Sequence, residues 1–109
     1  MKYKIIIGGP DDQEVIERII DVAAQAGAGT VGKYRRCAVI NKIVATWTPG
    51  KGSNPYEGEI GKPTVADCVF IDIECDEQSV RATYDAIKKI HPYDEPGIQI
   101  IKLEDIESF

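Results

Sequence analysis

Residues 91–96 of the chain are His91-Pro92-Tyr93-Asp94-Glu95-Pro96, a stretch that lies between the last helical pattern and the last strand pattern. It contains the only histidine and two of the six prolines. Each proline fixes its own φ angle and pushes the residue before it towards an extended conformation. The stretch is therefore a stiff corner carrying an imidazole, a phenol and two carboxylates, and we expect the rest of the chain to position it.

Length and charge exclude several classes of protein. The 109 residues suit a single domain, residues 1–109, that can bury a core without disulfides or a structural metal. A formal net charge of −5 gives no electrostatic reason to bind nucleic acid or an anionic membrane. No apolar run approaches the ~20 residues of a membrane helix, and the first residues do not have the pattern of a signal peptide. We therefore expect a cytoplasmic protein.

The hydrophobic pattern predicts four strands and two helices in the order β-α-β-β-α-β. In chain order, these elements are expected at residues 2–8, 11–26, 35–47, 64–75, 77–90 and 97–103. Asp11 and Asp76 are the expected N-caps of the two helices, and Asn41-Lys42 could form a bulge or a tight turn in the second strand. The natural closure is a ferredoxin-like α+β fold, a four-stranded antiparallel sheet with both helices on one face.

We expect the sheet face away from the helices to carry more apolar side chains than a solvent-exposed face usually does. Two helices would not cover all the apolar side chains of the sheet, which include Trp47, Phe70 and part of the run from Cys37 to Val44. This excess of apolar surface indicates burial in an oligomer. The strand at 35–47 is also longer than its partners need and could pair with another subunit.

Two glycine-rich loops connect these elements. Gly27, Gly29 and Gly32 have the spacing G-x-G-x-x-G, but a dinucleotide-binding motif must follow a strand and open a helix, and this one follows a helix. Two interpretations stay open: the glycines permit positive φ and close backbone approach, or their N–H groups form an anion-binding nest with Lys33. The second loop, residues 48–62, is long enough to suggest a function.

Charged side chains suggest two kinds of ligand. His91, Asp94 and Glu95 could bind a divalent metal ion if a second subunit, Cys37 or water completed the site. Alternatively, His91 is structural, ending the helix and pairing with acids.

A small anion or a nucleotide phosphate could instead bind the one local cluster of positive charge, which is otherwise a solvated face. That cluster consists of Lys33, Arg35, Arg36 and Lys51.

Catalysis is not expected. Cys37 and His91 could be a nucleophile and a base, but no third group orients them and no oxyanion hole is indicated. The three cysteines match no zinc module. We interpret them as reduced thiols that serve as small apolar residues, with a redox or metal role as the alternative.

Three motifs resemble, in the same order, those of the small domain inserted into YqfO-type dimetal proteins, bacterial relatives of the "interacting factor three" family. They are AGAGTVGKYRRC at 26–37, TPGKGSNPYEGEIG at 48–61 and HPYDEP at 91–96. The inserted domain is similar in fold to PII signalling proteins and to CutA divalent-cation-tolerance proteins, which are trimers of ferredoxin-like subunits. The resemblance implies a free-standing version of this domain, without the dimetal unit.

The resemblance also implies a function. PII proteins bind nucleotides and 2-oxoglutarate, and CutA proteins bind divalent metals, so a non-enzymatic, homotrimeric binding or regulatory module with a small-ligand site at its subunit clefts is implied. The alternative is a divalent-metal-binding protein or an accessory to a separate dimetal protein. The candidate ligand-binding residues are Gly29, Gly32, Lys33, Tyr34, Arg36, Asn54 and Tyr93. The candidate metal ligands are His91, Asp94 and Glu95.

Overall fold

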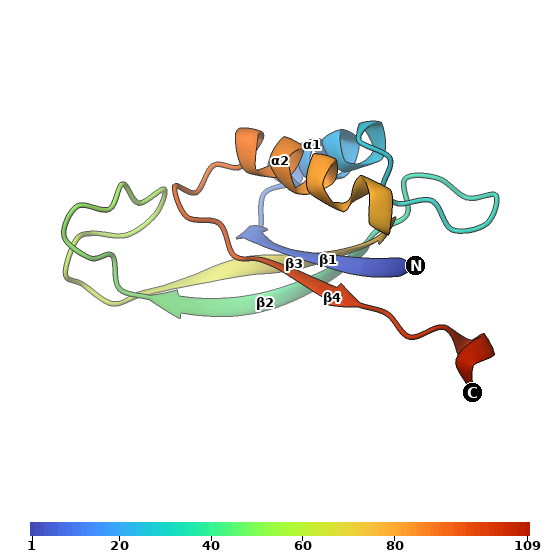
Figure 1. Ribbon diagram of the computed structural model, residues 1–109. Helices are drawn as coiled ribbons and strands as arrows, with labels where there is room; N and C mark the ends of the chain where they lie inside the picture. Colours follow the sequence, from blue (N-terminus) through green and yellow to red (C-terminus); the bar gives the residue numbers. More distant parts are fainter.

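The computed structural model describes all 109 residues as one antiparallel sheet with two helices packed on one face (Figure 1). The strand order is β2-β3-β1-β4. The strands are β1 (Lys2–Pro10), β2 (Val39–Trp47), β3 (Thr64–Asp76) and β4 (Ile98–Lys102). The helices are α1 (Gln13–Gln25) and α2 (Val80–Ile90), with short 3₁₀ helices η1 (Glu77–Ser79) and η2 (Ile106–Ser108). The predicted ferredoxin-like architecture is confirmed.

The core lies between the sheet and the helices because alternate strand residues point to the same face. Ile5 and Ile7 of β1 are fully buried, and in register with them Ile73 and Ile71 of β3 are buried too. Helix α1 packs its apolar stripe against this layer. The buried stripe consists of Ile16, Ile19, Ile20 and Ala23.

The predicted start of the β2 strand was wrong, while its predicted end at Trp47 is confirmed. The strand begins at Val39 instead of residue 35, because Arg36 takes a left-handed φ of 58°. The N–H of Cys37 then donates to the carbonyl of Gly29 at 2.8 Å, so this part of the chain belongs to the glycine-rich loop. The expected bulge or turn at 41–42 is absent, because Asn41 pairs in regular register with Phe70.

The predicted N-cap Asp11 is wrong, whereas Asp76 does occupy the N-cap position before η1. Asp12, one residue beyond the expected cap, accepts the N–H groups of Glu14 and Val15 at the start of α1. Asp11 instead forms an ion pair with Lys42 of β2. Asp76 makes no side-chain capping bond at η1, since its carboxylate is paired with a lysine of β1.

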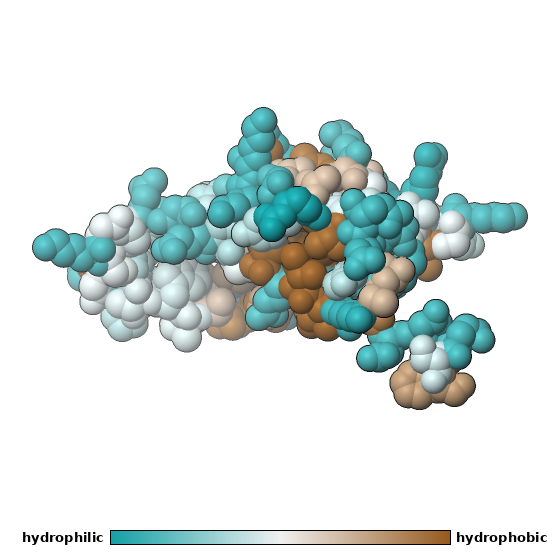
Figure 2. Space-filling view, in the orientation of Figure 1, coloured by the Kyte–Doolittle hydropathy of each residue, from teal (hydrophilic) through white to brown (hydrophobic).

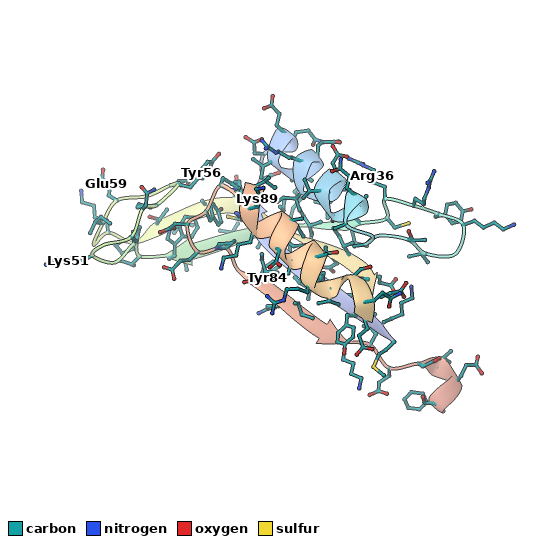
Figure 3. All side chains as sticks on the ribbon, turned by 45° about the horizontal axis from the view of Figure 1, so that its top comes forward. Arg36, Lys51, Tyr56, Glu59, Tyr84 and Lys89 are labelled. Atoms are coloured by element: carbon teal, nitrogen blue, oxygen red, sulfur yellow. The ribbon has the colours of Figure 1, made fainter.

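The two glycine-rich loops lie at opposite ends of the molecule (Figure 1). Strand β1 ends opposite Cys68, so residues 64–67 of β3 extend past it, paired only with β2, and the loop at 48–63 closes this overhang. Arg36 lies beside α1, whereas Lys51 stands at the outer tip of the other loop (Figure 3). The expected positive cluster therefore does not form within one chain.

The uncovered sheet face carries the apolar excess that the sequence suggested. Phe70 is 42% exposed and alternates with the buried Val69 and Ile71. A Cβ on Gly8 would lie 3.4 Å from the Phe70 ring, which is ordinary van der Waals contact. By register, the apolar side chains of this face are those of Ile6, Val39, Ile43, Ala45, Trp47, Ala66, Cys68, Phe70 and Ile101.

Hydrophobic side chains also gather between α2 and β4, while the C-terminal tail stands clear of the body (Figure 2). None of the helices has the length and apolar character required to cross a bilayer.

Candidate functional site

His91 ends helix α2 and anchors the corner at 91–96. The imidazole is 8% exposed. Its Nδ1 lies 3.0 Å from the backbone nitrogen of Tyr93 and its Nε2 lies 2.7 Å from the carbonyl oxygen of Gly8. Because the Tyr93 N–H has to donate, Nδ1 is the acceptor and Nε2–H donates to Gly8. Burial lowers the pKa of His91, although the bond to the Gly8 carbonyl opposes this shift, and the ring is neutral.

Tyr93 is the centre of an aromatic cluster. Its ring centroid lies 4.9 Å from that of His91, 5.7 Å from that of Tyr56 and 6.4 Å from that of Trp47. All three pairs are tilted, and their separations fall in the range over which aromatic rings interact. The phenol oxygen approaches Sγ of Cys68 at 3.7 Å. Burial, followed by this contact, raises the pKa of Tyr93 strongly, so the phenol stays protonated.

One hydrogen bond, from Asn54 to Asp94, joins the loop at 48–63 to the corner. The Asp94 carboxylate accepts the backbone N–H of Asn54 at 2.9 Å and that of Glu95 at 3.1 Å. Within the loop, the Trp47 indole N–H donates to the carbonyl of Glu57 at 3.3 Å. Two motifs that are 30 residues or more apart in the sequence therefore form one structural unit.

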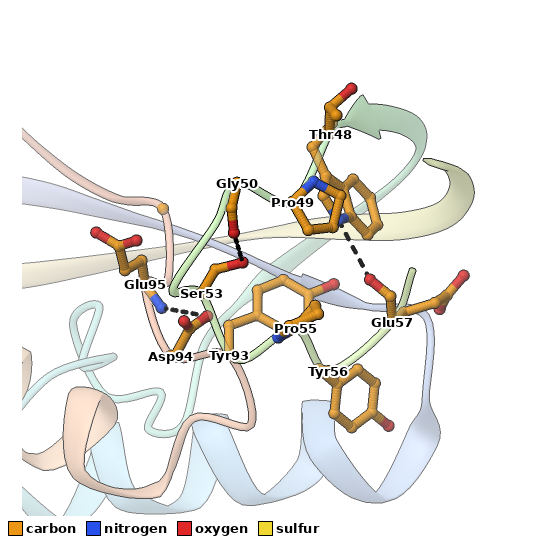
Figure 4. Close-up of a pocket in the computed structure, with 12 residues that line it drawn as sticks. Thr48, Pro49, Gly50, Ser53, Pro55, Tyr56, Glu57, Tyr93, Asp94 and Glu95 are labelled. Atoms are coloured by element: carbon orange, nitrogen blue, oxygen red, sulfur yellow. Dashed lines mark hydrogen bonds between the residues drawn. The ribbon is translucent and has the colours of Figure 1, made fainter. Parts of the chain in front are cut away.

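This unit encloses a pocket of about 340 Å³ (Figure 4). The pocket is lined by residues of two segments, 47–57 and 93–97. Its aromatic side chains are Trp47, Tyr56 and Tyr93, and its ionisable acids are Glu57, Asp94 and Glu95. No lysine, arginine or histidine lines it. The predicted residues Tyr93, Asp94 and Glu95 all line this pocket, and Asn54 is hydrogen-bonded to its rim.

The three predicted metal ligands do not converge. Both ring nitrogens of His91 are engaged by backbone groups, and Asp94 accepts two backbone N–H groups. No three histidine, cysteine, aspartate or glutamate side chains lie close enough together to hold a metal ion. Cys37, one expected completing ligand, lies in the loop at the other end of the molecule. Metal binding at His91 stays a prediction that requires this corner to rearrange.

The glycines of the loop at 27–37 have the positive φ angles and close backbone contacts that their structural interpretation predicts. Gly27, Gly29 and Gly32 all have positive φ. The N–H of Gly29 donates to the carbonyl of Glu74 at 2.8 Å, and a Cβ on Gly29 would lie 3.2 Å from the backbone oxygen of Cys37.

Five candidate ligand residues therefore lie in a loop that is separate from the pocket. Residues 31–34 form a tight turn that exposes Lys33 and Tyr34. The guanidinium of Arg36 pairs with Glu17 and Asp21 of α1, which compensates its charge. Anion binding here stays a prediction.

Sequence reasoning did not assign the pocket walls Trp47, Tyr56 and Glu57 to a site. Trp47 was expected only on the uncovered sheet face, and Tyr56 and Glu57 only as members of the 48–61 motif. Tyr56 and Glu57 lie inside the 48–61 motif and Trp47 directly precedes it, and this position was the available signal. Their contact with the corner depends on tertiary folding, which no local spacing reveals.

Comparison with known proteins agrees with the three motifs. No protein-family model matches the chain. A GTP cyclohydrolase 1 type 2 homolog of Halalkalibacterium halodurans is 28% identical over 101 residues, which cover 93% of this chain and 27% of the relative. The chain thus spans about a quarter of the length of the curated relatives that it matches.

Solved structures show the same fold. A Bacillus cereus protein related to NIF3 superimposes with a TM-score of 0.79 and 22% identity, covering 95% of this chain and 26% of that chain. The periplasmic divalent cation tolerance protein CutA from Archaeoglobus fulgidus has a TM-score of 0.68 and 21% identity, covering 96% of this chain and 86% of that chain.

These likenesses define the class of fold as CutA-like. More particularly, the chain is a PII/CutA-like domain related to YqfO-type and NIF3-related proteins. The resemblance inferred from the motifs is confirmed.

Proposed function

We propose that this domain is a small, non-enzymatic binding module that forms a homotrimer and holds a small ligand in the pocket between residues 47–57 and 93–97. The proposal rests on the hydrogen bond between Asn54 and Asp94, which joins the motifs at 48–61 and 91–96 into one structural unit. The pocket volume of about 340 Å³ falls in the usual range for small-molecule sites.

The composition of the pocket supports binding without catalysis. Two aliphatic hydroxyl side chains on the loop, Thr48 and Ser53, line the pocket. The Ser53 hydroxyl donates to the carbonyl of Gly50, and no histidine lines the pocket to act as a base. The longer relatives are named for GTP cyclohydrolase 1 type 2. That name assigns no activity to this chain, because the aligned part is about a quarter of their length.

The trimer is proposed from the resemblance to PII and CutA proteins together with the apolar sheet face around Phe70. Covering this face would remove apolar surface from water, which drives association. The edges of β2 and β4 are both free for further contacts. A cytoplasmic location stays a prediction, and one structural relative is named as periplasmic.

Divalent-metal binding is the second candidate function. It is favoured by the names of the structural relatives, which refer to divalent cation tolerance. Metal-dependent stabilisation that is lost in His91→Ala would support it, since the imidazole would have to be a ligand.

Thermal unfolding with a panel of nucleotides, amino acids, organic cations and divalent metal salts tests the binding proposal. A ligand that binds only the folded state stabilises it by about 2.7 kcal/mol at 100 times its Kd. We expect one class to raise the Tm of the wild type, to have a smaller effect on Tyr56→Ala, and to act unchanged on Tyr84→Ala, a matched control outside the pocket. No shift with any class would contradict the proposal.

A further inference from the structure

We propose that the pocket between residues 47–57 and 93–97 selects a small organic cation with a substituted ammonium group. This inference rests on the proposed binding function and names the chemical class of the ligand. Three properties of the pocket carry it: the aromatic walls, the uncompensated negative charge and the lack of a metal-binding geometry.

The walls present aromatic rings in a fixed arrangement. Tyr93 is flanked by Tyr56 and Trp47, with centroid separations of 5.7 Å and 6.4 Å. The Trp47 ring is held by its indole N–H bond to the loop, and Tyr93 is held by its contacts with His91 and Cys68. A substituted ammonium group gains energy over the face of such rings within ~6 Å, most when it is desolvated. The rings need little reordering to receive one.

The charge of the pocket selects the sign of the ligand. Glu57, Asp94 and Glu95 line it, and none of them takes part in an ion pair of the structure. The two nearest lysines in the loop do not compensate this charge. Lys51 points outward from the tip (Figure 3), and Lys62 pairs with Glu59. A phosphate would therefore meet only like charge, whereas a cation would be attracted.

The same carboxylates do not suit a bare divalent ion. Such an ion needs several oxygen ligands at close range in a defined geometry, and no three candidate side chains converge anywhere in the chain. An organic cation is large and weakly hydrated, so it needs aromatic faces and a negative surrounding instead of directed ligands. The pocket has both.

Trp47 makes the test direct, because it is the only tryptophan of the chain and lines the pocket. Its fluorescence is titrated with choline and, separately, with 3,3-dimethyl-1-butanol, which has the same shape without the charge. We expect saturable binding of choline and a Kd for the neutral alcohol about two- to fivefold higher, since one charge contact near a surface is worth up to about fivefold in affinity.

Two charge-removing variants and one control locate the site. Glu57→Gln and Glu95→Gln should each raise the Kd for choline about two- to fivefold, while Glu59→Gln, the same change in the same loop but outside the pocket, should leave it within twofold. Circular dichroism checks that each variant is folded. Added salt should weaken choline binding, because the carboxylates are exposed.

The possible failures are distinct. Equal binding of choline and the neutral alcohol, or tighter binding of ATP or Mg²⁺ in the same fluorescence titration, would overturn the organic-cation inference and leave the pocket as a ligand site. The absence of a saturable response to choline up to tens of millimolar also overturns the inference. Only a lack of Tm shift across the whole ligand panel would overturn the proposed binding function as well.

Discussion

At the scale of the residue, His91 decides how the corner is held. Its sequence position suggested either a metal ligand or a structural residue paired with acids. The contacts support a structural role, but the partners are the carbonyl of Gly8 and the N–H of Tyr93. Gly8 is 83 positions away in the chain. No sequence pattern could have identified Gly8 as the partner, because every residue type has a backbone carbonyl that can accept a hydrogen bond.

The pH dependence of stability follows from the buried, neutral state of His91. Its pKa in the folded protein lies below its ordinary value of 6.5 because of burial. As the pH falls through 6.5, the unfolded chain takes up a proton that the folded chain does not, so the free energy of unfolding decreases. Above this range, the histidine contributes no pH dependence. We therefore expect the wild type to lose stability between pH 7.5 and 5.5 in urea unfolding.

His91→Ala is the control for this effect. The variant should be about 1–3 kcal/mol less stable at pH 7.5, because a partly buried carbonyl and a partly buried N–H lose their partner. It should also lose less stability than the wild type on acidification to pH 5.5. Equal slopes in the two proteins, or a wild type that becomes more stable at pH 5.5, would contradict the assignment of a neutral, buried imidazole.

At the scale of the element, the pattern of hydrophobic residues predicted all four strands and both helices. Alternation and helical periodicity are local properties, and the core face depends only on them. The errors lie where tertiary contacts decide. Strand β2 starts late because Cys37 is bonded to Gly29, and Asp11 is drawn away from capping by Lys42. The pocket itself joins two loops, and each was predicted only as a separate motif.

Gly29 tests the account of the glycine-rich loop. Its φ of 83° is strained for any L side chain, and an added Cβ would lie 3.2 Å from the Cys37 oxygen. We expect Gly29→Ala to reduce the free energy of unfolding by about 1–3 kcal/mol in urea. Gly50→Ala is the matched control, since Gly50 has no positive φ and open space around it. Equal effects of the two substitutions would refute the structural role of Gly29.

At the scale of the whole molecule, the sheet has one covered and one uncovered face. The sequence predicted this excess of apolar residues correctly, because strand alternation assigns Phe70 to the face opposite Val69 and Ile71. The sequence could not predict how many copies of the chain cover this face, since the pattern of one chain does not specify its neighbours. The pocket lies at the overhanging end of the same sheet, so assembly and ligand binding are both expected to depend on this architecture.

Native mass spectrometry of gently purified protein tests the central claim, a trimeric ligand-binding module, most directly. We predict a mass of three 12.0 kDa chains with a small additional mass from a bound ligand. Phe70→Asp, which places a charge on the uncovered face, should give folded monomer, while Gln78→Asp, an equal change on the exposed η1, should stay trimeric. A wild type found only as a bare monomer of 12.0 kDa would contradict the account.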